Sequence, residues 1–392
     1  MHQGRYQESI KVFDVVRRKM RKIENMSGVA MCELYLGLCH YYLGDYGKAH
    51  ELLNTSVDRY KHLNHQYQAV KALNNIGGIY HATGNMLKAM EYFSQSVEIC
   101  RKTSDLYSVG AIQGNLGVLY HERGLYNRAA ASLEESLSIS RKLGDRTGIA
   151  TSLMNLAALR MDQGELRKPL SMLEEAEKLA EEMGDKYLTV YNLVLQGDLY
   201  LLYGDLPSSL DRYEGCRKLA AEIGLRSQEI VAQANIAWIQ ARQGEIQPAI
   251  EMVLQTVSSA EVQGDSDSIL RSRSRLAEIY LLAARYDDAR RAAAPGLKLA
   301  RKRGHITYQW QFAACVGRAW FDQGDYERAF RAFRLVIQVM LALRKQLEQD
   351  LSTTFFAQPL VRHLLEDIRE TAEILQRSDS WATVKKLLDL AD

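Results

Sequence analysis

Glycine recurs along this chain at a fixed spacing of 40 residues, and that spacing restricts the fold more than any other feature of the sequence. The series consists of Gly4, Gly44, Gly84, Gly124, Gly164, Gly204, Gly244 and Gly324, and Ala284 stands at the one position that breaks it. A second series lies midway between these positions, at Gly144, Gly184, Gly224, Gly264 and Gly304. Self-similarity at a fixed period is typical of solenoids, which grow by stacking one small unit on the next.

The segments between successive glycines have the apolar pattern of amphipathic helices. In one repeat, apolar residues at helical separations include Leu116, Leu119, Tyr120, Leu133 and Leu137. Such spacing places apolar side chains on one face of a helix. Glycine adopts the positive φ that ends a helix without steric cost. No stretch shows the period-two alternation of a strand, so the sequence predicts an all-α chain of paired helices.

A third series of small residues lies inside the first helix of each pair. It consists of Gly37, Gly77, Gly117, Ala157, Gly197, Ala237, Ala277 and Gly317. A small side chain at a fixed helix position lets the neighbouring helix approach closely. Three residues later come large rings, at Tyr80, Tyr120, Tyr200, Tyr280 and Trp320. We interpret both series as parts of the core.

Taken together, these residues resemble the tetratricopeptide repeat (TPR). The turn phrases Gly44-Asp45-Tyr46 and Gly324-Asp325-Tyr326 complete the pattern. The usual TPR period is about 34 residues, so a period of 40 implies longer helices. This longer form resembles the repeats of LGN/Pins-like adaptors, of Rap/Rgg-like regulators and of the helical sensor regions of bacterial STAND signalling ATPases. The resemblance covers residues 4–348 and implies a right-handed α-α superhelix (TPR solenoid).

The repeat pattern divides the chain into an array, residues 1–348, and a C-terminal segment, residues 349–392. The array comprises a half repeat at 4–24 and eight hairpins that start near 26, 66, 106, 146, 186, 226, 266 and 306. The C-terminal segment is predicted to form capping helices, one of which begins at Pro359. The chain opens with the second helix of a repeat, so we expect further repeats or another domain upstream.

The seventh hairpin departs from the pattern. Besides Ala284, it carries Pro295-Gly296 inside its second helix. Proline there removes a backbone hydrogen bond and kinks a helix. We therefore expect a local bend near residues 285–300.

Composition predicts a cytoplasmic protein or the cytoplasmic part of one. Apolar residues make up 47% and charged residues 25%, as in ordinary soluble proteins. No run of about 18 apolar residues and no signal-peptide core is present. The cysteines are scattered without a Cys-x-x-Cys pair, which indicates buried thiols rather than disulfides. They are Cys32, Cys39, Cys100, Cys216 and Cys315.

Motifs that carry chemistry are missing from the sequence. It contains no phosphate-binding Gly-x-x-x-x-Gly-Lys-Ser/Thr loop, no Gly-x-Gly-x-x-Gly, no His-Glu-x-x-His and no Gly-x-Ser-x-Gly. The nine histidines do not cluster with cysteines at metal-ligand spacing. We therefore predict no catalytic residue, no metal and no cofactor.

Asparagine recurs in the first helices at Asn75, Asn115, Asn155 and Asn235. Asparagine is a mediocre helix former, so its recurrence inside a helix requires a reason. Its side chain offers both a donor and an acceptor, which suits pairing with an extended peptide backbone. Alternatively, each amide bonds a neighbouring helix of the array. The resemblance to LGN-like and kinesin light chain-like TPRs implies that this position lines a concave groove that holds a peptide.

The same resemblance implies that further residues line that groove: Lys71, His81, His121, Trp238, Arg242, Arg271, Arg275 and Arg318. Arg271 and Arg275 are four residues apart and share a helix face. They could form bidentate hydrogen bonds with a carboxylate or phosphate of a partner, or pair with acidic residues of this chain. Charge is uneven along the sequence, with a net −10 over residues 161–268 (9 Lys+Arg against 19 Asp+Glu) and +7 over 271–303 (10 against 3).

The sequence therefore predicts a non-catalytic scaffold, the regulatory or sensor region of a larger signalling protein. Its concave face would bind a peptide, a protein segment or another domain of the same polypeptide. We expect a monomer or weak dimer. One alternative is a stand-alone adaptor that bridges two protein partners. Another is a nucleic-acid-binding helical array that uses the basic residues 271–303.

Overall fold

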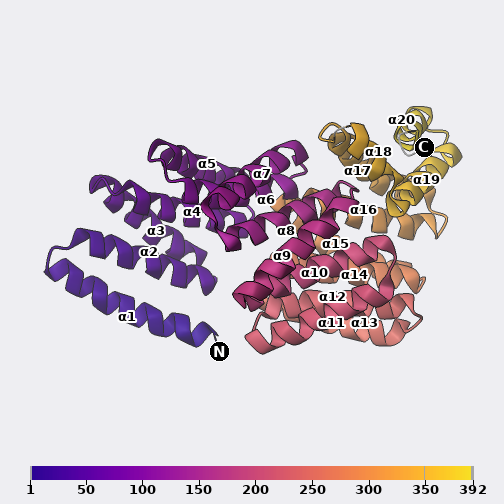
Figure 1. Cartoon of the computed structure of the whole chain (residues 1–392). Coiled ribbons are helices and arrows are strands. Elements are labelled where there is room, and N and C mark those ends of the chain that lie inside the picture. The colour runs from indigo at the N-terminus through magenta and orange to yellow at the C-terminus, as the bar shows by residue number, and fades with distance from the viewer. Residues whose placement is uncertain (1, 348, 390–392) are drawn as a thin grey trace. The chain divides into compact units, whose positions relative to one another are not determined.

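A computed structural model describes residues 2–347 and 349–389 of the chain, and these residues form an all-α structure (Figure 1). Twenty helices and no strand occur in these ranges. Helices adjacent in sequence make the most extensive contacts with one another. This pattern is that of a solenoid, in which each repeat packs mainly on its neighbours.

The helices follow the 40-residue period. The chain begins with α1 (His2–Lys22). The first helices of the next eight pairs, here called A helices, are α2 (Met26–Tyr42), α4 (Gln66–Ala82), α6 (Leu106–Glu122), α8 (Arg146–Asp162), α10 (Lys186–Tyr203), α12 (Arg226–Arg242), α14 (Ser266–Leu282) and α16 (Ile306–Phe321). The second helices, here called B helices, are α3 (Tyr46–His62), α5 (Met86–Lys102), α7 (Tyr126–Leu143), α9 (Arg167–Met183), α11 (Leu206–Ile223), α13 (Ile246–Gln263), α15 (Tyr286–Arg303) and α17 (Tyr326–Arg344). Three further helices follow, α18 (Gln349–Ala357), α19 (Pro359–Ile374) and α20 (Ser378–Leu388).

In the Gly-Asp pairs of the sequence, the glycine lies at the end of one helix and the aspartate at the start of the next. Gly184 adopts a φ of +62° at the end of α9, a conformation that costs glycine little. The following residue, Asp185, caps α10 because its carboxylate accepts hydrogen bonds from the backbone N–H groups of Tyr187 and Leu188. Asp45 and Asp325 cap α3 and α17 in the same way.

Contacts divide the chain into two compact units. Unit 1 contains the described residues up to Leu119 together with Ser132–Gly144, and unit 2 contains Tyr120–Ala131 together with the described residues from Asp145 onward. Helices α6 and α7 contribute residues to both units. The core of unit 1 includes Leu53 and Ile76, which are completely buried between the A and B helices.

The small residues of the A helices face large side chains of the B helices. A Cβ atom added to Gly77 would lie 2.7 Å from a ring carbon of Phe93, and one added to Gly197 would lie 2.7 Å from the ring of Tyr213. Distances this short are not tolerated between real carbon atoms. The prediction that small residues let the neighbouring helix approach is therefore confirmed.

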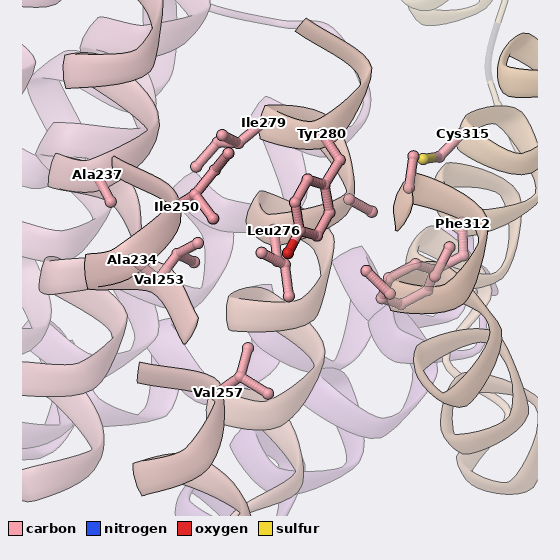
Figure 2. Packing of buried hydrophobic residues seen from close by; sticks show 14 of the residues in the cluster. Ala234, Ala237, Ile250, Val253, Val257, Leu276, Ile279, Tyr280, Phe312 and Cys315 are labelled. Carbon is pink, nitrogen blue, oxygen red and sulfur yellow. The ribbon is translucent and has the colours of Figure 1, made fainter. Parts of the chain in front are cut away.

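The core of unit 2 continues the same packing from α12 to α16. Figure 2 shows Ile250 and Val253 of α13 beside Leu276 and Ile279 of α14, with Phe312 of α16 further along. The labelled side chains are hydrocarbon except for the Tyr280 hydroxyl and the Cys315 thiol.

The irregular seventh hairpin keeps the helical-hairpin form. Ala284 takes the place of the turn glycine and adopts a φ of +54°. Helix α15 continues without interruption through Pro295. Gly296 is required here because the ring of Phe312 occupies the space of a side chain.

Three further sequence-based expectations concern Pro359, the cysteines and membrane spans. Pro359 stands at the start of α19, where its missing N–H is harmless. All five cysteines are buried as free thiols. None of the described helices is both long enough and apolar enough to span a bilayer.

Candidate functional site

The A helices present one face that hairpin packing does not use. On α4 this face includes positions 71, 75 and 78, whose separations of four and three residues bring them to one side of a helix. Equivalent positions recur every 40 residues on the other A helices. We call the surface made by these positions the A-helix face and describe it separately in each unit.

In unit 1 the A-helix face is rich in amides and tyrosines. The Asn115 side chain is exposed, and its Nδ2 donates a hydrogen bond of 3.2 Å to Oδ1 of Asn74 on the preceding A helix. Asn75 beside it is half-buried. The Lys71 ammonium lies 4.5 Å from the ring centroid of Tyr67, which is 44% exposed. Since an amide can make several hydrogen bonds, the contact between Asn115 and Asn74 leaves capacity for others.

In unit 2 the face carries an ion pair between side chains that are 73 residues apart. The Arg271 Nη1 lies 2.6 Å from Oδ1 of Asp198, and the hydroxyl of Tyr213 donates a hydrogen bond of 2.6 Å to the same oxygen. Burial alone would lower the pKa of Arg271, but the Asp198 carboxylate together with Tyr308 and Tyr213 raises that pKa well above its usual value. The guanidinium is thus charged and held in one position.

A second arginine lies on the same helix, one turn further along. Arg275 donates from Nε to Oδ1 of Asn235 at 2.8 Å and forms an ion pair of 2.9 Å with Glu278. Its guanidinium also lies 4.9 Å from the ring centroid of Trp238, and that of Arg242 lies 5.7 Å from it. These distances are within cation–π range.

Asn235 differs from the other asparagines of the series. Its side chain is completely buried, and besides accepting from Arg275 it donates a hydrogen bond of 3.1 Å to the carbonyl of Val231. Asn235 therefore orients Arg275 rather than presenting its own amide at the surface. Asn155, in α8, is half-buried.

The remaining predicted residues lie near helix ends or beside the C-terminal helices. His81 is half-buried in the last turn of α4. His121 Nε2 lies 2.9 Å from Oδ2 of Asp162 at the end of the next A helix. Arg318 forms an ion pair of 2.9 Å with Asp367 of α19. Within the described ranges, no three His, Cys, Asp or Glu side chains are arranged to hold a metal ion.

Sequence reasoning missed Asp198 and Glu278, although a signal for them exists. Both residues follow directly after the small residue of their A helix, at the same repeat position as Trp238 and Arg318. In the first four hairpins this position holds only uncharged residues, Leu38, Gly78, Val118 and Ala158. The change to charged and aromatic residues marks the helices that carry the cluster.

The arginines after residue 270 pair extensively with acidic side chains of this chain. In addition to the pairs above, Arg273 contacts Glu261, and Arg285 and Arg291 both contact Asp288. The internal pairing considered for Arg271 and Arg275 is therefore present in the structure. Much of the positive charge of residues 271–303 is neutralised locally.

Comparisons with known proteins agree with the repeat architecture. Residues 68–142 match the family described as tetratricopeptide repeat, and residues 118–196 match anaphase-promoting complex subunit 5. No match to a curated protein is found.

Three solved structures of similar fold are complexes with a factor or a peptide. The chain is 14% identical to a Rap protein complexed with competence and sporulation factor, with a TM-score of 0.64 and coverage of 88% of this chain and 98% of that one. It is 13% identical to NprR in complex with its cognate peptide NprX, with a TM-score of 0.61 and coverage of 86% and 98%. It is also 13% identical to the Rap conjugation gene regulator of the plasmid pLS20 in complex with the Phr* peptide, with a TM-score of 0.59 and coverage of 88% and 96%. At these identities the likeness shows the fold alone.

Proposed function

We propose that this chain, whose repeats are tetratricopeptide repeats, is a non-catalytic scaffold that binds a peptide or protein segment on its A-helix face. The three similar structures include complexes with a factor or peptide, named above. These complexes support the proposal. The side chains of the A-helix face indicate how this chain would hold one.

The observation that carries the proposal is the cluster on the A-helix face of unit 2. Arg271, Asp198 and Tyr213 fix one another, as do Arg275, Asn235 and Glu278. The arginine side chains retain 26% and 18% exposure, so further N–H donors can reach a partner. Groups already ordered before binding lose less conformational entropy when a partner arrives. Such preorganisation favours a recognition surface.

In unit 1 the amide row would recognise the backbone of an extended segment. Asn75 and Asn115 lie at equivalent positions of adjacent A helices, and Asn155 has the same repeat position in unit 2. An amide can donate to a backbone carbonyl and accept from a backbone N–H. The rings of Tyr107, 60% exposed, and of Tyr67, on the same two A helices, supply apolar contact area.

The biological context of the proposal is that of a regulatory or sensor region within a larger signalling protein. Its partner would then be a peptide or another domain of the same polypeptide. A stand-alone adaptor would use the same face for two separate proteins. The nucleic-acid alternative is disfavoured, because Arg273, Arg285 and Arg291 already pair with carboxylates of this chain.

The proposal is tested with peptides selected from a random phage-displayed library against the whole chain. Affinity of a selected peptide is then measured by fluorescence anisotropy for the parent and for paired variants. Asn115→Ala is matched by Asn127→Ala, an exposed asparagine on a B helix. Arg242→Ala is matched by Arg217→Ala, whose side chain is 46% exposed on α11.

We expect the A-helix variants to weaken binding about tenfold, because each lost hydrogen bond to a desolvated group costs roughly 1–3 kcal/mol. The B-helix controls should bind as the parent does. Selected peptides that bind all four variants equally, with circular dichroism unchanged, would show that binding uses another surface.

A further inference from the structure

Two of the turn glycines are packed against distant segments of unit 2, unlike their equivalents. No described atom lies within 4 Å of a Cβ placed on Gly44, Gly204 or Gly324. A Cβ on Gly124 would instead lie 2.8 Å from side-chain atoms of both Ile306 and Leu343. These contacts join the turn between α6 and α7 to helices α16 and α17.

The next turn along the array is packed in the same way. A Cβ on Gly164, between α8 and α9, would lie 2.8 Å from the backbone of Phe355 in α18 and 2.8 Å from Nε2 of Gln358. The partners lie far along the chain, since 306 − 124 = 182 and 355 − 164 = 191 residues. A contact over this separation is not part of the nearest-neighbour packing that builds a solenoid.

Polar groups join the same segments. Asp162 Oδ2 accepts a hydrogen bond of 3.2 Å from the hydroxyl of Thr307 and lies 2.9 Å from Nε2 of His121. One carboxylate at the end of α8 therefore connects α6 with the start of α16. Gly304, in the turn before α16, lies close to the Arg123 guanidinium, since a Cβ there would be 3.0 Å from Nη1.

Buried polar groups without a hydrogen-bond partner occur in the segments that make this contact. Among the described residues, His305 Nδ1, Ser352 Oγ and Gln358 Nε2 are buried without a hydrogen-bond partner. Each such group costs roughly 1–3 kcal/mol relative to exposure in water. All three belong to the segments on one side of the contact, namely the α15–α16 turn, α18 and the residue that follows α18. Opening the contact would return them to water.

We propose that this contact is a releasable latch that switches unit 2 between a closed and an open arrangement of its A helices. The latch consists of the α6–α7 and α8–α9 turns on one side and of the α15–α16 turn with α17 and α18 on the other. Because every hairpin keeps its packing on its neighbours, the latch opens without unfolding a repeat. This goes beyond the proposed function, since the switch exists whatever the partner is.

Release also has a physical consequence for the A-helix face. The helices that carry Asp198, Trp238 and Arg271 lie in sequence between the two sides of the latch. Small rotations between successive hairpins, summed over this stretch, change the spacing of these side chains. The latch therefore couples a distant contact to the geometry of the cluster.

The latch is tested by electron paramagnetic resonance on the whole chain, with spin labels at Asn127→Cys and Arg344→Cys. Both positions are exposed and lie close in sequence to Gly124 and Leu343, which meet in the latch. The native thiols are all buried, so labelling is confined to the introduced cysteines. Asp162→Ala removes the carboxylate that joins α8 to α16. Asp322→Ala is the matched control, because it changes the equivalent residue four repeats later.

We expect short distances between the labels in the parent and in Asp322→Ala, and a new population of long distances in Asp162→Ala with helix content unchanged. Unchanged distances in Asp162→Ala would show that the contact is a fixed part of the fold and would overturn the proposal. Loss of helix content together with the contact would overturn it as well. No binding partner enters this measurement, so its failure is distinct from that of the proposed function.

Discussion

Two consecutive glycines of α4, Gly77 and Gly78, provide a matched pair for testing how the hairpins pack. Gly77 belongs to the series of small residues, and a Cβ there would lie 2.7–3.1 Å from three ring atoms of Phe93. No described atom lies within 4 Å of a Cβ placed on Gly78. Both residues are inside the same helix, so alanine changes the intrinsic helix propensity by a similar amount at each position.

The expected magnitudes follow from these two environments. Replacing glycine by alanine inside a helix stabilises it by about 1 kcal/mol. Gly78→Ala should therefore raise the free energy of unfolding by about that amount. Gly77→Ala gains the same propensity but also inserts a methyl group into a filled space, which costs roughly 1–3 kcal/mol. The two variants should thus differ by about 1–3 kcal/mol, with Gly77→Ala the less stable.

Urea denaturation followed by far-UV circular dichroism measures the difference. Because repeats of a solenoid can unfold separately, hydrogen exchange of peptides from α4 and α5 should be recorded as well. Exchange should slow in Gly78→Ala and accelerate in Gly77→Ala. Equal stability of the two variants would refute the idea that the small residues are required by the ring of the following B helix.

Two further predictions concern a turn and the cysteines. Ala284→Gly should raise the free energy of unfolding by about 0.5–1 kcal/mol. Alanine at a φ of +54° is strained by roughly 1–2 kcal/mol, whereas glycine is not. A urea midpoint below that of the parent would contradict this prediction. Burial raises the pKa of Cys100 to about 11 and that of Cys216 to about 12. Since a free thiol has a pKa of about 8.5, these side chains should stay protonated at that pH and fail to react with a disulfide reagent until denaturant is added. The protonated thiols contribute fully to the free energy of unfolding below the pKa of a free thiol. That contribution is lost as pH rises from there through the raised pKa values of the folded protein. Rapid reaction of native protein at pH about 8.5 would show that the thiols are accessible.

The hairpins could be predicted from the sequence because their determinants are local. A turn glycine, an Asp cap, a small residue and its large partner all fall within one 40-residue repeat. Gly77 and Phe93, for example, are 16 residues apart, since 93 − 77 = 16. Interactions at this range recur in each repeat, so periodicity reveals them.

Less of the candidate site could be predicted. The series of asparagines is visible in the sequence, yet Asn235 is buried and bonded to Arg275, whereas Asn115 is exposed. The position of a residue within the repeat determines on which side of the helix its side chain lies. Its burial depends on the neighbouring A helix, whose side chains differ from repeat to repeat. Asn235 is bonded because the next A helix presents Arg275, forty residues later.

The sequence alone therefore determines the repeating unit, the number of helical hairpins and the face on which each side chain lies, because these depend on spacings shorter than one period. Only the tertiary structure decides that Arg271 meets Asp198 and that Gly124 meets Ile306. Such contacts depend on the rotation between successive hairpins, summed over several repeats. A small difference in each rotation moves distant residues by many ångströms. No local pattern in the sequence predicts the accumulated rotation.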